Sequence, residues 1–343
     1  MKKILAIIFY LIIMSACEKQ GSKTIENTDP SIYAIKYGEH PLQSFTLHTP
    51  MNADNTTKVA ILIHGGGWVM GYHPDESVTT FTGRYNWDIH TPLLEAGIAV
   101  LTMKYRTACY NTQPDKFDND TRFYIDRMIE DINLVIDNLK DNKDTYNVNP
   151  SDIHLVGESG GGHIAMYYGI QSSNRSEVKS VVSMFGPTDL DADNFKTIVN
   201  DVPVLPVSPP NYFLRQAENC TSVSNVSVKT IFSLKSFSDH HEILIDGHNP
   251  FLDTLSTTYL PNIKNNIPFF VTHGVEDELV PYDQAESMVS ALESAYGENR
   301  IGEENFNGKI KLGRYENCGH GWTGSQCNRN KVVSDIVTWV TRQ

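Results

Sequence analysis

Short apolar runs alternate with stretches of helical periodicity from about residue 35 to the end of the chain. The stretch at 126–142 carries apolar residues three and four positions apart, which is one face of an amphipathic helix. These residues are Met128, Ile132, Val135, Ile136 and Leu139. The β-rich runs are KVAILIH (58–64), GIAVLTMKY (97–105), DIHLVG (152–157), KSVVSMFG (179–186), IPFFVTHG (267–274) and GKIKLGRYE (308–316). Apolar strands that alternate with helices predict an α/β fold, with a mostly parallel central β-sheet and helices on both faces.

The alternation breaks down between about residues 189 and 265. Segments such as VPVLPVSPPNY and SFSDHHEILIDGHNPF are rich in Pro, Ser and Asn. We interpret 189–265 as a cap-like insertion over a site at the strand ends, because ligands gather there in open α/β sheets. Within it, Tyr212 and Phe213 are candidates to line a substrate pocket.

The first residues have a different composition from the rest of the chain. MKK precedes the apolar run ILAIIFYLIIM, and Ser15 and Ala16 follow before Cys17. This arrangement resembles a bacterial lipobox, which implies a signal peptide over 1–17, cleavage before Cys17 and lipidation of that cysteine. A plain signal peptide and an N-terminal membrane helix are the alternatives. Polar residues 18–34 then serve as a tether, so we expect an exported lipoprotein anchored to the cell envelope, facing either the periplasm or the outside.

Export changes how the cysteines are interpreted. The chain has five, and Cys109, Cys220, Cys318 and Cys327 remain once Cys17 is lipidated. Disulfides persist in oxidising compartments, and closeness in sequence favours the Cys318–Cys327 pair among the three possible pairings. These cysteines lack CxxC spacing, so we expect no metal site among them. A formal net charge of -13 argues against nucleic acid as a partner.

The strongest chemical signal is the pattern Gly-x-Ser-x-Gly around Ser159. In DIHLVGESGGGHIAMYYG (152–169) a strand precedes GESGG, and an apolar helix opens at about Gly162. This is the strand, sharp turn and helix in which a nucleophilic serine is exposed. A Gly-rich turn without chemistry is the alternative, but it leaves the GES placement unexplained. We therefore expect Ser159 to be a nucleophile.

A serine nucleophile needs a base and a group that orients the base. Of the twelve histidines, His320 follows a β-like run in a glycine-flanked loop and is the best candidate. His273 ends a buried strand and is expected to be structural. His163 lies inside the helix after Ser159 and is expected to point in the wrong direction to act as its base. Asp277 ranks first as the orienting acid and Glu276 second. The order Ser159, Asp277, His320 is that of an α/β-hydrolase.

The three consecutive glycines in HGGGW (64–68) cost stability, so we expect a function that requires backbone without side chains at this position. Acyl transfer places negative charge on a carbonyl oxygen, and preorganised backbone N–H groups stabilise it, each by about 10²–10³ in rate. We assign this role to Gly66, Gly67 and Gly160, with Gly65 as a possible replacement for one of them. His64 is expected to brace the loop. Trp68 is a candidate wall of the acyl pocket, with a core position as the alternative.

Together these motifs resemble α/β-hydrolases of the esterase and lipase type. The familiar GESAGGHLA corresponds to GESGGGHIA here, with Gly160 in place of alanine, and YGEHPLQSFTLHTP (37–50), MFGPTDL (184–190) and HGVEDELVPY (273–282) are also similar. The resemblance implies a catalytic domain over 35–343 and a serine esterase that needs no cofactor. It further implies short-chain acyl or aryl ester substrates, including acetyl or feruloyl groups on glycans. A peptidase or amidase on the same fold and a non-catalytic cell-surface binding module are the alternatives. The oligomeric state is left open.

Overall fold

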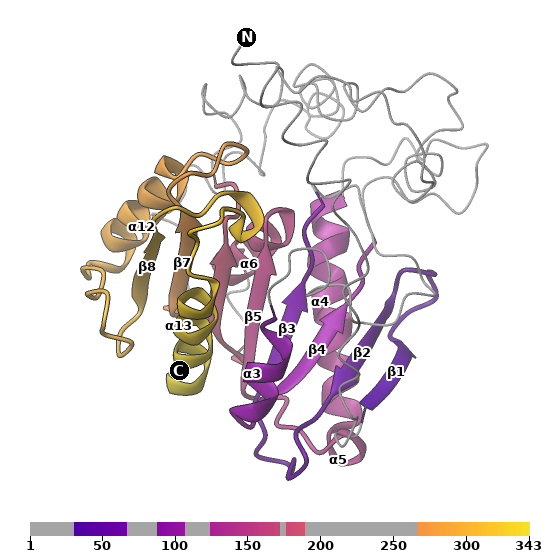
Figure 1. Cartoon of the computed structure of the whole chain (residues 1–343). Coiled ribbons are helices and arrows are strands. Elements are labelled where there is room, and N and C mark those ends of the chain that lie inside the picture. The colour runs from indigo at the N-terminus through magenta and orange to yellow at the C-terminus, as the bar shows by residue number, and fades with distance from the viewer. Residues whose placement is uncertain (1–30, 67–87, 107–123, 172–175, 189–265) are drawn as a thin grey trace, which may run out of the picture.

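The computed structural model describes residues 31–66, 88–106, 124–171, 176–188 and 266–343 (Figure 1). Its sheet has eight strands in the spatial order β1-β2-β4-β3-β5-β6-β7-β8. The strands are β1 (Ser31–Lys36), β2 (Ser44–His48), β3 (Val59–Ile63), β4 (Ala99–Met103), β5 (Ile153–Glu158), β6 (Val178–Met184), β7 (Phe269–Gly274) and β8 (Ile310–Tyr315). The helices are α3 (His90–Glu95), α4 (Tyr124–Asp141), α5 (Lys143–Tyr146), α6 (Gly160–Gln171), α12 (Asp283–Tyr296), the 3-10 turn η3 (His320–Trp322) and α13 (Arg329–Arg342).

Six neighbouring strands of the sheet run parallel. Strand β4 pairs in parallel with β3, and the parallel ladder continues through β5, β6 and β7 to β8. Only β1 and β2 add antiparallel pairs at one edge. Every residue of β3, β4 and β5 is buried, as expected for strands that are covered on both faces. The predicted α/β fold with a mostly parallel sheet is confirmed.

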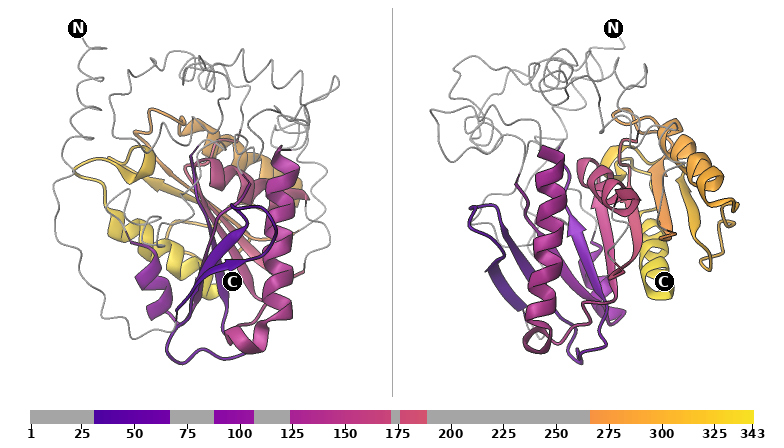
Figure 2. Two further views of the ribbon diagram at one scale, coloured as in Figure 1. Left: turned by 90° about the vertical axis from the view of Figure 1, so that its right-hand side faces the viewer. Right: turned by 180° about the vertical axis from the view of Figure 1, so that it is seen from behind.

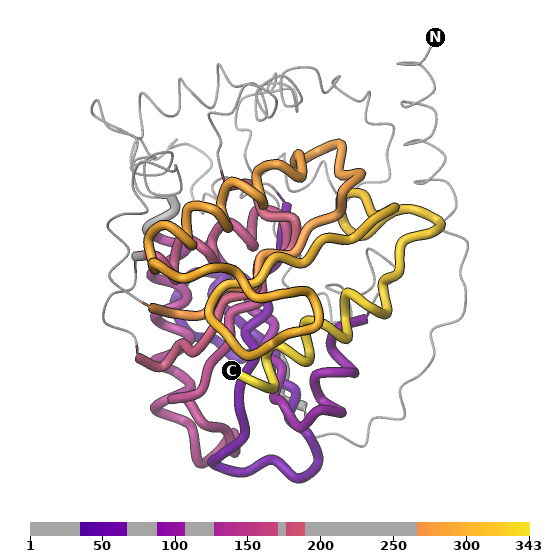
Figure 3. The backbone as a smooth tube through the Cα atoms, turned by 90° about the vertical axis from the view of Figure 1, so that its left-hand side faces the viewer, coloured from indigo at the N-terminus to yellow at the C-terminus, as the bar shows by residue number. Residues whose placement is uncertain are grey.

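Helices cover both faces of this sheet. Helices α4, α6 and α12 pack on one face, where the five apolar positions predicted for the helix at 126–142 are all buried. Helices α3 and α13 pack on the other face. Figure 1 shows α3 and α13 in front of the sheet, and the rear view in Figure 2 shows α4, α6 and α12. In the side view of Figure 3, α12 and α13 lie on opposite sides of the strands.

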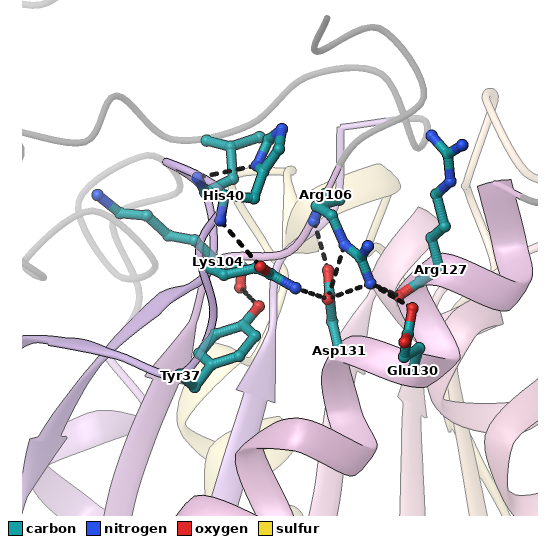
Figure 4. A network of polar contacts seen from close by, with 9 residues as sticks. Tyr37, His40, Lys104, Arg106, Arg127, Glu130 and Asp131 are labelled. Atoms are coloured by element: carbon teal, nitrogen blue, oxygen red, sulfur yellow. Dashed lines mark hydrogen bonds and ion pairs between the residues drawn. The ribbon is translucent and has the colours of Figure 1, made fainter. Parts of the chain in front are cut away.

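A buried carboxylate fixes the carboxyl end of β4 to helix α4. Asp131 of α4 accepts hydrogen bonds from the Arg106 backbone N–H (2.7 Å), from Arg106 Nε (2.9 Å) and from Gln43 Nε2 (2.8 Å). Arg106 also pairs with Glu130 at 2.7 Å, and Tyr37 donates to the Lys104 carbonyl (Figure 4). Burial opposes the charge of Arg106, but its hydrogen bonds to Asp131 and Glu130 raise its pKa overall. This network holds the chain in place where it leaves the sheet.

The predicted tether overlaps the first described residues of the chain. Strand β1 begins at Ser31, so the last residues of the predicted 18–34 tether belong to the sheet. The remainder of the tether, Cys17 and the insertion at 189–265 lie outside the described residues.

No helix in the described ranges has both the length and the apolar character needed to cross a bilayer. The favoured disulfide is confirmed, since Cys318 and Cys327 are bonded, whereas Cys109 and Cys220 lie outside the described residues.

Candidate active site

Ser159 occupies a sharp turn between strand β5 and helix α6. Its φ of 50° is left-handed, a conformation that costs energy for a residue with a side chain. The crossing of strand and helix is close, because a Cβ on Gly157 would lie 2.1 Å from the Gly161 carbonyl oxygen. A Cβ on Gly161 would lie 2.2 Å from the Ile63 carbonyl oxygen. Glycine is therefore required on both sides of the serine, and helix α6 starts at Gly160, two residues earlier than expected.

His320 reaches Ser159 from the loop between β8 and α13. Its Nε2 lies 3.1 Å from Ser159 Oγ. The imidazole packs edge-on against Phe185, with ring centroids 4.7 Å apart, and Phe185 packs in the same way against Trp322 at 5.1 Å. Phe185 follows β6 and has a left-handed φ of 42°. An aromatic wall from another strand end thus fixes the orientation of the imidazole.

Asp277 lies on the far side of the imidazole, in the turn after β7. Its Oδ2 lies 2.8 Å from His320 Nδ1, and its Oδ1 accepts from the backbone N–H groups of Leu279 (2.9 Å) and Val280 (2.8 Å). The side chain is fully buried. Burial raises the pKa of the carboxyl, but the charge of His320 and hydrogen bonds from His273 and His320 outweigh it and hold the pKa well below its usual range. Asp277 is therefore the ionised group that orients His320.

The other candidates for base and acid lie elsewhere. His163 is buried in α6, where its backbone N–H donates to the Ser159 carbonyl, and burial lowers its pKa to about 3. Glu276 has an exposed side chain and donates its backbone N–H to the Cys318 carbonyl. The structure thus brings Ser159, His320 and Asp277 together in hydrogen-bonded succession.

The glycine-rich loop after β3 approaches the serine closely. A Cβ on Gly65 would lie 3.0 Å from Ser159 Cβ, and Gly66 has a φ of 104° that favours glycine. The Gly65 N–H donates to Glu158 Oε1 at 3.2 Å, so it is not available for an oxyanion. Gly160 lies in the first turn of α6, where backbone N–H groups lack partners within the helix. Gly67, Trp68, Tyr212 and Phe213 lie outside the described residues.

His64 stacks on a tyrosine beside this loop. The His64 and Tyr105 rings are 4.2 Å apart at 15°, and Tyr105 donates its hydroxyl to the His64 carbonyl at 2.9 Å. His64 Nδ1 also lies 2.7 Å from the Gly65 carbonyl. These contacts agree with the bracing role expected for His64.

Within the described ranges, no three side chains of His, Cys, Asp or Glu are grouped so that they could hold a metal ion. The histidines of the insertion lie outside those ranges.

Two family models match successive parts of the chain. The BD-FAE model matches residues 45–204, and the prolyl oligopeptidase family model matches residues 222–343. A solved structure of a truncated carbohydrate esterase from gut microbiota has a TM-score of 0.57 at 18% identity, over 92% of this chain and 97% of that one. The chain has an α/β-hydrolase fold. A bifunctional GH43-CE protein of Bacteroides eggerthii shares the α/β-hydrolase fold at a TM-score of 0.56 and 19% identity, over 91% of this chain and 38% of that one.

Relatives found by sequence match a smaller part of this chain than the solved structures do. The isoprenylcysteine alpha-carbonyl methylesterase of Arabidopsis thaliana is 26% identical over 165 residues, which are 48% of this chain and 34% of that protein. The matched part thus spans about a third of the relative's length.

Sequence reasoning missed three supporting residues of this α/β-hydrolase site. Glu158 accepts a hydrogen bond from the glycine loop, Phe185 packs on His320, and His273 contacts Asp277. Glu158 and Phe185 fall within the quoted motifs, but no local pattern shows which side chain they meet. His273 was expected to be structural, and its position four residues before Asp277 was the available signal.

Proposed function

We propose that this protein is a serine carboxylic ester hydrolase. The observation that carries the proposal is the succession of Ser159, His320 and Asp277, with contacts of 3.1 and 2.8 Å. Ser159 Oγ attacks the ester carbonyl carbon while His320 Nε2 takes its proton. The same proton then passes to the leaving alcohol, which leaves Ser159 acylated. Water attacks the acyl group by the same route and releases the carboxylic acid.

The remaining assigned groups stabilise this reaction electrostatically. Asp277 holds the imidazole with Nδ1 protonated and stabilises the imidazolium that forms. The N–H groups of Gly66, Gly67 and Gly160 hold the oxyanion, supported by the place of Gly65, the residue before Gly66, beside the serine and of Gly160 at the start of α6. None of these steps requires a cofactor.

For substrate we propose short-chain acyl or aryl esters, including acetyl or feruloyl groups on glycans. Similar proteins described as a carbohydrate esterase and a methylesterase support this class. Trp68, Tyr212 and Phe213 are the proposed lining of the pocket. We also propose that the protein is exported and held in the cell envelope by a lipid on Cys17, as the MKK, apolar and Ser-Ala-Cys succession favours.

A peptidase or amidase is a second candidate, because the prolyl oligopeptidase family model matches the segment that carries Asp277 and His320. Amide hydrolysis uses the same three residues but expels a poorer leaving group. Rates with p-nitrophenyl acetate and with a dipeptide anilide, measured on one preparation, separate the two activities.

Ser159→Ala tests the proposal directly. We expect kcat for p-nitrophenyl acetate to fall by about 10⁶ and fluorophosphonate labelling to vanish. Ser151→Ala, at an exposed position, is the matched control and should leave both unchanged. If Ser159→Ala retains a tenth of the activity, the nucleophile is another residue. If the folded wild type is neither active nor labelled, the chain is a non-catalytic binding module.

A further inference from the structure

The acid of the triad contacts a second histidine. His273, near the end of β7, has a fully buried side chain. Its Nε2 lies 2.8 Å from the Val280 carbonyl oxygen and 3.3 Å from Asp277 Oδ2. Its Nδ1 is buried and has no hydrogen-bond partner among the described residues. Asp277 Oδ2 therefore lies between two imidazoles, those of His320 and His273.

These contacts determine which nitrogen of His273 carries hydrogen. A carbonyl oxygen only accepts, so the short contact with Val280 requires a hydrogen on Nε2. A hydrogen on Nδ1 would be a buried donor without an acceptor, which is costly. His273 is thus the Nε2–H tautomer, and its single hydrogen is shared between the Val280 carbonyl and Asp277 Oδ2.

We propose that His273 is a positioning residue of the triad, which moderates the charge on Asp277 Oδ2 and so tunes the basicity of His320. The inference rests on the proposed function. Two backbone N–H groups hold Oδ1, so the carboxylate keeps its place if the His273 hydrogen is lost. The negative charge on Oδ2 would then act on His320 alone. That charge stabilises the imidazolium, so His320 would become easier to protonate.

The other surroundings of His273 are favourable for this role. Tyr282 packs edge-on against its ring at 6.0 Å and donates its own hydroxyl to Glu286 at 2.9 Å. Arg314 lies over the Tyr282 ring at 5.1 Å. Asp277 is the charged group in contact with His273 among these neighbours, and Glu286 and Arg314 lie beyond Tyr282. An effect of His273 on the pH profile would therefore act through Asp277.

His273→Phe removes the hydrogen and keeps a ring of similar size. We expect kcat to change by less than about threefold with KM within twofold, because the two backbone N–H groups on Oδ1 keep the carboxylate in place. The acidic limb of the kcat/KM profile, which reports protonation of His320, should move to higher pH by about half a unit. His273→Gln places an amide N–H near the position of Nε2 and should restore the wild-type position of this limb. His154→Phe is the matched control, because it removes a buried imidazole that contacts a different carboxylate, Asp152, at 3.1 Å.

The control should lose stability and keep the wild-type pH profile. A folded His273→Phe enzyme with an unmoved acidic limb would overturn the inference, as would His273→Gln behaving like His273→Phe. If His273→Phe does not fold, His273→Asn replaces it, because its shorter side chain withdraws the donor from Asp277. A wild type without esterase activity or fluorophosphonate labelling refutes the proposed function instead, so the two failures are distinguishable.

Discussion

The loops that bring Asp277 and His320 to Ser159 are held in different ways. The acid turn (residues 275–282) is organised around one buried carboxylate, since Asp277 Oδ1 accepts two backbone N–H groups of its own turn. Among the described residues with positive φ, none falls in this turn. The structure of the acid turn therefore depends on the same side chain that contacts His320.

The histidine loop (residues 316–328) has no such central carboxylate. Four of its residues have left-handed backbone, and the Cys318–Cys327 disulfide closes the loop around His320. The left-handed residues are Asn317, Gly321, Trp322 and Gly324. The Cys318 carbonyl accepts the Glu276 N–H at 3.0 Å, so the two loops also touch. His320 thus lies in an irregular loop that is closed by the disulfide and by hydrogen bonds from the Arg329 side chain to the Trp322 and Gly324 carbonyls.

Among changes to the two loops, Asp277→Asn in the acid turn should have the largest effect on activity. The amide cannot hold His320 in its working tautomer, so we expect kcat to fall by about 10⁴. Steady-state kinetics with p-nitrophenyl acetate measure it. Glu276→Gln is the control, because its side chain is exposed and its backbone N–H makes the contact with Cys318. A comparable loss in both variants would mean that the turn is sensitive to any change, rather than that Asp277 orients the base.

The features of the fold and the site differ in how far they could be predicted from the sequence. Strand runs, the GESGG turn and the order Ser159, Asp277, His320 are local or ordinal signals, so the sequence was sufficient for the fold and for the candidate residues. The contacts of His273 and Phe185 depend on how strand ends approach one another, and no spacing encodes that approach. The predicted tether overran the start of β1 because it was placed by the polar composition of the preceding residues, which gives no sharp boundary where this six-residue edge strand begins.

Loss of the disulfide should affect the histidine loop more moderately. The crosslink joins residues nine positions apart, and closing such a loop contributes about 2–3 kcal/mol to the free energy of unfolding. Urea unfolding of a variant with both Cys318→Ala and Cys327→Ala, compared with the wild type, measures it. Equal stability of the two proteins would show that the hydrogen bonds of the loop suffice without the crosslink. The control is the wild type in reductant, which should approach the stability of the variant.

A substitution at one left-handed residue of the histidine loop should have the smallest effect on stability. Asn317 is exposed and has a φ of 59°, a region that asparagine tolerates and alanine does not. Asn317→Ala should therefore lower the free energy of unfolding by about 1 kcal/mol, whereas Asn317→Gly should leave it nearly unchanged. Glu278→Ala, exposed in the acid turn, is the control and should cost less than about 0.5 kcal/mol. If both alanine variants are neutral, left-handed backbone at residue 317 does not distinguish the histidine loop from the acid turn, and the disulfide remains as the feature that separates them.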